Sequence, residues 1–246
     1  MSLDNIRIVL VRTFHPGNIG SAARSMKTMG LTDLALVSPK DYPSDEAIKM
    51  SAGASDVLAN ACVHGSITEA IKDCTAVIAS TARPRGYDLP EVNPSEAAEI
   101  LLSSAKTNPV ALIFGPERMG LHNDDIQYAK YRVTIPANPE YSSLNMASAV
   151  QTLSYEIFKS SQAESPTKGV RAERQLPTSN QLELFYQHLE IVLQDISFLR
   201  PHQGETLQRL RHLYSRAEPD VLELNILRGI LTATQKTIAK NSTEDR

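Results

Sequence analysis

The 246-residue chain has no tryptophan, only 2 cysteines and no excess of positive charge. With aromatic residues at 5%, it offers little for an extended surface on which nucleic-acid bases stack. Cys62 and Cys74 are too few for a disulfide framework and too far apart for a Cys-x-x-Cys metal pair. A formal net charge of −3 argues against a protein that binds any nucleic acid indiscriminately.

Long apolar runs are also missing. The longest, such as residues 8–11 and 110–114, are far too short to cross a bilayer. The first residues do not show the charged, apolar and small-residue regions of a signal peptide. These absences predict a cytoplasmic protein that has no membrane association and no bound metal.

Short apolar runs alternate with amphipathic stretches from residue 6 to residue 160. This alternation predicts α/β architecture, with a parallel sheet covered by helices on both faces. Ligands of such sheets bind beyond the carboxyl ends of the strands. The predicted strands are 6–11, 34–37, 76–80, 110–114 and 132–135, and the predicted helices are 21–29, 67–72, 94–104, 124–129 and 144–159.

The composition divides the chain into three parts. Residues 1–160 form the sheet domain, residues 161–177 form a flexible polar linker, and residues 178–246 form an extension of three helices. An extension of this size has a marginal core, so we expect it to dock on another surface. Its arginines suit a few phosphate contacts, although a solvated helix face with i,i+4 pairs is the alternative. These arginines are Arg200, Arg209, Arg211, Arg216 and Arg228.

The first candidate loop, 13–24, follows the first predicted strand. Gly17 and Gly20 would permit unusual backbone angles, and the start of the next helix would present N–H groups to an anion. Arg24 is expected one turn into that helix, pointing toward the ligand edge of the sheet. The alternative is a capped helix with an exposed arginine.

Two further candidate loops follow strands 110–114 and 132–135. In the first, Gly115 ends an apolar strand and would let the backbone approach a ligand closely, although a tight turn with surface charges is the alternative. In the second, Ser142 or Ser143 would cap the next helix, which leaves Asn145 unexplained as an amide inside the first turn.

The three loops together closely resemble the motifs of SPOUT-class RNA 2′-O-ribose methyltransferases. Residues 137–145 and 225–231 fit, more narrowly, the bacterial subgroup that methylates the ribose of nucleotide 32, a cytidine or uridine, in the anticodon loop of tRNA. The motifs are Asn18-x-Gly20-Ser21-x-x-Arg24, Phe114-Gly115-Pro116-Glu117-Arg118-x-Gly120 and Ile135-Pro136…Ser142-Ser143-Leu144-Asn145.

The resemblance implies a trefoil knot at the end of the sheet domain, whereas the arginines of the helical extension are what predicts that it binds tRNA. The resemblance also implies a homodimer, in which the first loop of one subunit completes the cofactor pocket of the other. The cofactor would be S-adenosyl-L-methionine, released as S-adenosyl-L-homocysteine. The resemblance assigns its binding to Ser80, Thr81, Ala82, Gly115, Ile135, Ser142, Ser143 and Leu144.

The resemblance further assigns catalytic roles. Arg24 would act with an RNA phosphate, either as a bidentate clamp or, if its pKa were strongly lowered, as a proton acceptor. Arg83 and Arg85 would contact RNA phosphates, or else form an ordinary solvated surface. Asn18, Glu117, Ser143 and Asn145 would orient the ribose, Arg24 and the cofactor by hydrogen bonds.

Three other functions compete with this one. A methyltransferase of the same class could act on another tRNA or rRNA ribose. A non-catalytic tRNA-binding module should have lost Arg24 or the Ser143–Asn145 segment, and both are present. A dinucleotide-dependent oxidoreductase should show Gly-x-Gly-x-x-Gly in the first loop, which it lacks.

Overall fold

The computed structural model describes residues 3–82, 89–162, 175–199 and 204–244. The chain divides into two compact units, Met1–Pro166 and Thr167–Arg246, called here the sheet unit and the helical unit. Arg83, Arg85, Arg200 and most of the predicted linker 161–177 lie outside the described residues.

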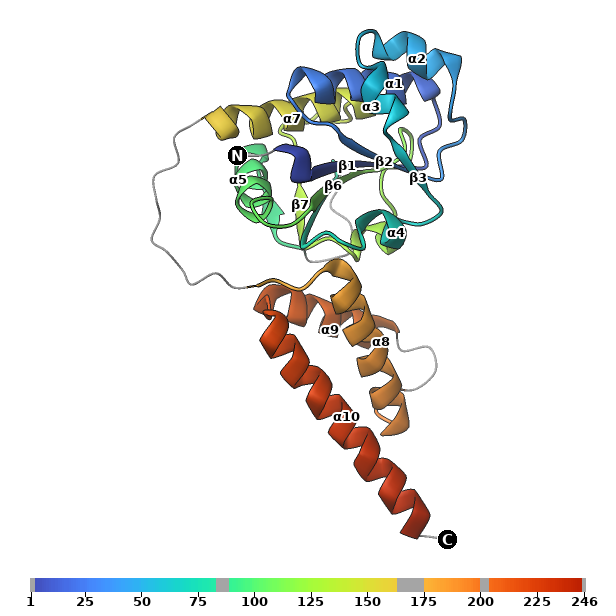
Figure 1. The fold of residues 1–246 in the computed structure, drawn as a ribbon, viewed down its shortest axis with the longest axis vertical. Helices are drawn as coiled ribbons and strands as arrows, with labels where there is room; N and C mark the ends of the chain where they lie inside the picture. The colour runs from blue at the N-terminus through green and yellow to red at the C-terminus, as the bar shows by residue number, and fades with distance from the viewer. Residues whose placement is uncertain (1–2, 83–88, 163–174, 200–203, 245–246) are drawn as a thin grey trace. The chain divides into compact units, whose positions relative to one another are not determined.

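The sheet unit is built on seven strands in the order β3-β2-β1-β6-β4-β7-β5 (Figure 1). Every neighbouring pair is parallel, so the strands end at a common edge. Phe114 is in register with both Leu10 and Ser80, which places the ends of three strands side by side. The strands are β1 Ile6–Val11, β2 Asp33–Val37, β3 Cys62–His64, β4 Ala76–Ser80, β5 Glu91–Val92, β6 Val110–Phe114 and β7 Tyr131–Val133.

Helices cover both faces of this sheet, which confirms the predicted α/β class. Strand β1 sends Ile8 and Leu10 into one apolar cluster and Val9 and Val11 into another, so it is buried on both sides. Figure 1 shows α1, α2, α3 and α7 above the sheet and α4 below it. The helices are a 3-10 turn at Leu3–Asn5, α1 Pro16–Thr28, α2 Asp45–Ser51, α3 Ser55–Ala59, α4 Ile67–Ile71, α5 Pro94–Ser104, α6 Asn123–Ile126 and α7 Met146–Gln162.

The first helix differs from the prediction. It begins at Pro16 rather than Ser21, because proline fits the first helical position, where its missing N–H costs nothing. Gly17 and Gly20 therefore lie within α1 and do not serve unusual backbone angles. A Cβ on Gly20 would lie 2.1 Å from the carbonyl oxygen of Ala47, so this glycine permits α1 to pack closely on α2.

The helical unit contains α8 Ser179–Asp195, α9 Gly204–Ala217 and α10 Val221–Glu244, which confirms the predicted helical extension. Its buried apolar core is small: Phe185, Tyr186, Leu189, Val192, Leu224 and Leu231. Of the apolar positions that mark α10 in the sequence, Leu222, Ile226 and Ile230 lie on an exposed face of the helix instead. The trefoil knot stays a prediction.

Arg211 joins two helices of the helical unit. Its guanidinium donates to both carboxylate oxygens of Glu183, at 2.7 and 2.9 Å, and lies 4.5 Å from the ring centroid of Tyr186. This pairing gives Arg211 a partner within its own unit, and the expected phosphate contact at Arg211 stays a prediction. Arg209 and Arg216 are exposed on α9.

Candidate functional site

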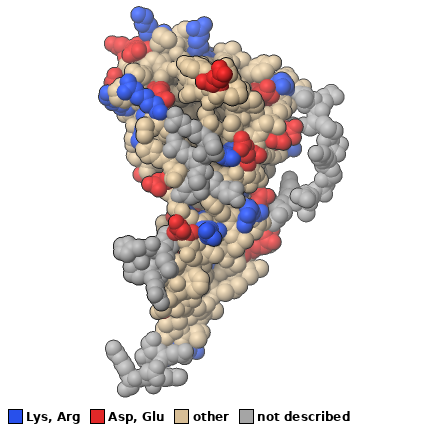
Figure 2. Space-filling model, turned by 180° about the vertical axis from the view of Figure 1, so that it is seen from behind, with Lys and Arg blue, Asp and Glu red and all other residues tan. Residues whose placement is uncertain are grey.

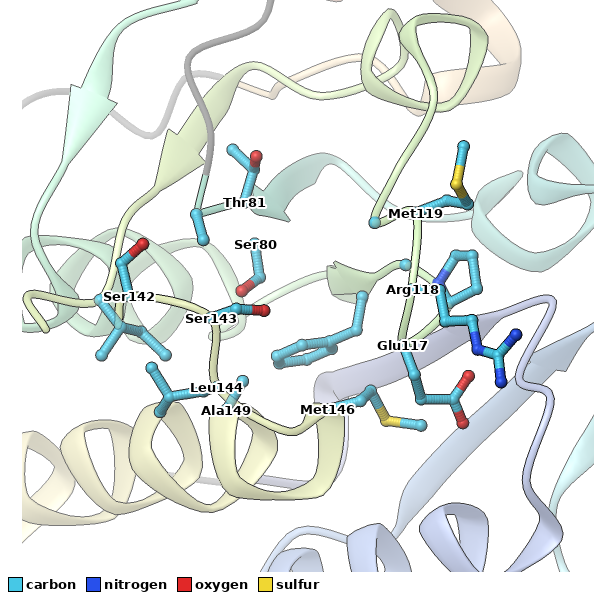
Figure 3. A pocket seen from close by; sticks show the side chains of 16 residues that line it. Ser80, Thr81, Glu117, Arg118, Met119, Ser142, Ser143, Leu144, Met146 and Ala149 are labelled. Carbon is cyan, nitrogen blue, oxygen red and sulfur yellow. The ribbon is translucent and has the colours of Figure 1, made fainter. Parts of the chain in front are cut away.

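A pocket opens at the carboxyl ends of β4 and β6 and is closed on one side by the loop that precedes α7. It contains about 750 Å³ of empty space, counting open solvent at its mouth. Figure 3 shows Ser142, Ser143 and Leu144 on one side of it, and Glu117 and Arg118 on the other. The lining includes every residue to which the resemblance assigned the cofactor: Ser80, Thr81, Ala82, Gly115, Ile135, Ser142, Ser143 and Leu144.

Gly115 is required by the protein's own backbone. A Cβ at this position would lie 2.2 Å from the backbone nitrogen of Leu121 and 2.3 Å from the carbonyl carbon of Gly120. The loop after β6 therefore folds back onto Gly115, with Gly120 in the left-handed region at φ +65°. This close approach favours the alternative of a tight turn, since a side chain at Gly115 would displace the backbone of residues 120 and 121. Close approach of a ligand at Gly115 stays a prediction.

A chain of hydrogen bonds joins the three loops beside this pocket. Asn145 donates through Nδ2 to Oδ1 of Asn18 at 3.1 Å, and Asn18 donates through Nδ2 to Oε1 of Glu117 at 2.7 Å. Asn145 is 127 positions from Asn18 in sequence, and Asn18 is 99 positions from Glu117. The fold thus brings together three of the predicted orienting residues, and each asparagine donates a hydrogen bond to the next residue of the chain of bonds.

Glu117 is the acceptor at the end of this chain. It is half-buried, and its two carboxylate oxygens also accept from the backbone N–H groups of Phe14 (3.1 Å) and His15 (3.2 Å). Burial raises the pKa of Glu117, but the hydrogen bonds from Asn18 and from backbone amides outweigh it and hold the pKa below its usual value. The carboxylate is therefore ionised and fixed just before the N-terminus of α1.

Asn145 is the cap of α7, and this corrects the expectation that a serine caps it. Helix α7 begins at Met146, and Oδ1 of Asn145 accepts from the backbone N–H of Ala147 at 2.8 Å. Asn145 therefore lies before the first turn rather than inside it. Ser142 and Ser143 are exposed and line the pocket.

Arg24 does not join this arrangement within one chain. Because α1 begins at Pro16, Arg24 lies about two turns into the helix rather than one. Its side chain is exposed and is not part of the pocket lining. Thr28 Oγ1 donates to its carbonyl oxygen at 2.8 Å, but its guanidinium makes no hydrogen bond or ion pair with the described part of the chain. The structure thus separates Arg24 from the other predicted site residues.

Several pocket residues were not singled out from the sequence. Most belong to the same loop or to the first two turns of α7, so adjacency to the motifs is the signal that would have found them. They are Met119, Met146 and Ala149, while the lining residues Phe114, Pro116, Arg118 and Gly120 belong to the second motif but had no assigned role.

Arg12 and Asp125 form an ion pair that the sequence did not indicate. Arg12, at φ +49°, donates through Nη1 to Oδ1 of Asp125 at 3.0 Å and through Nη2 to Oδ2. Asp125 is only 5% exposed, and its Oδ2 also accepts from the backbone N–H of His122 at 2.7 Å. The pair ties the end of β1 to the segment that follows the pocket loop.

The charges of the described surface are mixed. On the face seen in Figure 2, lysine and arginine side chains are interspersed with aspartate and glutamate. Within residues 3–82, 89–162, 175–199 and 204–244, no three histidine, cysteine or acidic side chains are placed to hold a metal ion. In the same ranges no helix has the length and hydropathy of a membrane span.

Comparisons with known proteins identify both units. Residues 5–155 match the model of the SpoU rRNA Methylase family, and residues 180–244 match that of the tRNA methyltransferase TrmJ, C-terminal domain. A relative from Pectobacterium atrosepticum, named tRNA (cytidine/uridine-2′-O-)-methyltransferase TrmJ, is 50% identical over 240 residues, covering 96% of this chain and 98% of its own.

Two solved structures extend the similarity to the fold. The crystal structure of TrmJ from Zymomonas mobilis has a TM-score of 0.82 at 35% identity, covering 93% of this chain and 98% of its own. A probable methylase family protein from Haemophilus influenzae has a TM-score of 0.63 at 44% identity, covering 97% of this chain and 99% of its own.

Proposed function

We propose that this chain transfers a methyl group from S-adenosyl-L-methionine to a ribose 2′-hydroxyl of tRNA. The chain belongs to the SpoU rRNA methylase family, and its C-terminal residues match the TrmJ C-terminal domain. The target would be a cytidine or uridine at nucleotide 32 of the anticodon loop. The observation that carries this proposal is one pocket, lined by every residue that the motifs assign to the cofactor, with the Asn145–Asn18–Glu117 chain beside it.

The pocket residues fit S-adenosylmethionine. Ile135 and Leu144 would provide apolar walls, and the hydroxyl groups of Ser80, Ser142 and Ser143 would donate to its polar edges. When bound, the cofactor supplies a methyl group already activated on a sulfonium, so the protein's own task is to position the nucleophile.

Asn18, Glu117 and Asn145 would act as positioning residues. They fix the loop between β1 and α1 against the loop after β6 and the start of α7, so the walls of the pocket keep their geometry. Arg24 would clamp the phosphate next to the target ribose. A guanidinium can donate two parallel hydrogen bonds to the oxygens of one phosphate, and it stays protonated, so it is a poor base.

A homodimer would bring Arg24 to a pocket. In one chain Arg24 is exposed outside the pocket lining, so we assign it to the pocket of a second copy. Mixed dimers test this assignment. Arg24→Ala and Leu144→Arg chains, co-expressed with different tags, should regain activity in the heterodimer, about a quarter of the wild-type rate in an equal mixture. An inactive heterodimer would place Arg24 in its own pocket.

The two units would have different roles in the reaction. Residues 1–160 would carry the chemistry, and residues 178–246 would orient the tRNA through phosphate contacts such as those of Arg209 and Arg216. A tRNA substrate agrees with a cytoplasmic location, and the proposed reaction needs neither a metal nor a membrane.

Mapping of ribose methylation tests the function directly. tRNA incubated with the protein and S-adenosylmethionine should gain one 2′-O-methyl group at nucleotide 32. Methylation of a different ribose would reassign the target. Cofactor and tRNA binding without any methyl transfer would make the protein a non-catalytic binding module.

A further inference from the structure

An exposed aromatic ring with two cations lies beside the pocket. Phe14 is 44% exposed, Nζ of Lys40 lies 3.5 Å from the centroid of its ring, and Cζ of Arg118 lies 5.8 Å from the same centroid. The edge of the His15 ring also packs on Phe14, with centroids 4.9 Å apart. We call Phe14, Lys40 and Arg118 the Phe14 cluster.

The backbone holds this cluster in place. The N–H of Phe14 donates to Oε2 of Glu117 at 3.1 Å, and the N–H of Lys40 donates to the carbonyl oxygen of Thr13 at 3.0 Å. Glu117 and Arg118 both line the pocket. The ring is therefore presented at the rim of the pocket by the same residues that form its wall.

A single exposed apolar side chain needs no explanation by itself. Here, however, the ring is joined by two cations, and neither Lys40 nor Arg118 forms an ion pair with the residues that the structure describes. Glu117, the carboxylate next to Arg118 in sequence, is already occupied by Asn18 and two backbone amides. A flat π-surface next to two cations that form no ion pair among the described residues suits a nucleotide, because its base stacks and its phosphate is an anion.

We infer that the Phe14 cluster binds a nucleotide of the anticodon loop next to the target, with the base stacked on Phe14 and Lys40 and Arg118 on the neighbouring phosphates. The inference rests on the proposed function for the identity of the RNA. An exposed cation–π contact is weaker than the stacking of a base on an aromatic ring, so the base displaces the ammonium of Lys40. The released ammonium then contacts phosphate.

Two substitutions of Phe14 separate stacking from simple apolar contact. Phe14→Leu keeps an apolar side chain and removes the ring, so KM for tRNA should rise about tenfold while kcat and the affinity for S-adenosylmethionine stay unchanged. Phe14→Tyr keeps the ring and should bind tRNA like the wild type. Equal tRNA affinity in the Leu variant and the wild type, or equal loss in the Leu and Tyr variants, would overturn the inference.

Lys40→Gln tests the phosphate contact. The slope of log K against log salt for tRNA binding should fall by about 0.7, the value for one phosphate contact on a single strand. Lys72→Gln is the matched control, because Lys72 is exposed just before β4, at the opposite end of that strand from the pocket. Equal slopes for both variants would remove Lys40 from the RNA surface.

Two measurements keep the inference separable from the proposed function. Filter binding of tRNA by the wild type and Phe14→Leu decides the role of Phe14 even if no methyl transfer is found. Sedimentation equilibrium gives the mass of each variant. A Leu variant that loses tRNA affinity only because it falls to a smaller mass would assign Phe14 to a contact between subunits and overturn the RNA assignment.

Discussion

The sheet unit and the helical unit bury apolar side chains to very different extents. Two large clusters, one on each face of the sheet, surround β1 and β6, whereas the helical unit has one core of six buried residues. The helical unit also leaves Leu222, Ile226 and Ile230 exposed at 74%, 65% and 58%. A well-buried sheet supports loops that serve a ligand, while the helices depend on a few specific contacts for their own stability.

The largest effect is expected from a residue that serves the reaction and not the stability of the sheet unit. Arg24 is such a residue, because its side chain is exposed. Arg24→Ala should lower the methylation rate about 100-fold or more, because no other group replaces a bidentate phosphate clamp. Removal of one group that stabilises developing negative charge lowers kcat by about this factor in other enzymes. The affinity for S-adenosylmethionine and the melting temperature should not change. Tritium transfer and calorimetry give the two readings, and Arg24→Lys should restore little. Substantial turnover in Arg24→Ala would remove Arg24 from the reaction.

Removal of the helical unit should have the next largest effect. A chain ending at Ser160 should bind S-adenosylmethionine like the full chain, because the whole pocket lining lies before residue 150. Its kcat/KM for tRNA should fall by about 100-fold through the loss of phosphate contacts that orient the substrate. Gel shifts and methyl-transfer assays measure both effects. Full activity of the shortened chain would leave tRNA recognition to the sheet unit alone.

A smaller effect, confined to the helical unit, is expected from its half-buried ion pair between Arg211 and Glu183. Arg211→Ala should lower the free energy of unfolding of that unit by about 2 kcal/mol, since Glu183 would stay half-buried without its bidentate partner. The exposed Arg209 is the matched control on the same helix. Urea unfolding followed by circular dichroism should show a change for Arg211→Ala and none for Arg209→Ala.

The same pair gives a pH dependence. The hydrogen bonds from Arg211 hold the pKa of Glu183 below its usual value in the folded unit. Folding is therefore stabilised above the unfolded-state pKa of about 4.3, and this contribution is lost as the pH falls through the lower folded pKa. Glu183→Gln should unfold with a weaker dependence on acid in that range. An unchanged acid profile would contradict the assignment.

The smallest effects compare helix caps in the two units. Asn145→Ala and Thr178→Ala each remove a side chain that accepts from the first turn of a helix, so each should cost about 1 kcal/mol. Only Asn145→Ala should also lower kcat, because Asn145 holds Asn18 as well. Equal kcat in the two variants would show that the Asn145–Asn18 bond does not matter to the reaction.

The sequence predicts the buried strands well. The ranges of β1, β4 and β6 agree with prediction because each is mostly apolar and buried on both faces. Strands β3 and β5 were missed, since they have three and two residues and their side chains give no clear pattern. The start of α1 was misplaced because Pro16 and Gly17 are typical of a loop as well as of a first helical turn.

The candidate site could be predicted as a set of residues but not as a set of contacts. Residues that follow parallel strands must meet at one edge, which is why the predicted cofactor residues line one pocket. The pairing of Asn18 with Glu117, the bond from Asn145 to Asn18 and the ion pair of Arg211 join side chains far apart in sequence. No local pattern specifies such partners.

The Asn145–Asn18–Glu117 chain leaves neither amide free to rotate by half a turn. A backbone N–H at Ala147 can only donate and the Glu117 carboxylate can only accept, so the polarity of every bond between them is set from both ends. Each Nδ2 uses one hydrogen in the chain and retains a second in a fixed direction. Asn145→Asp would preserve the cap yet place two acceptors opposite each other, and the mismatch would travel along the chain to the carboxylate.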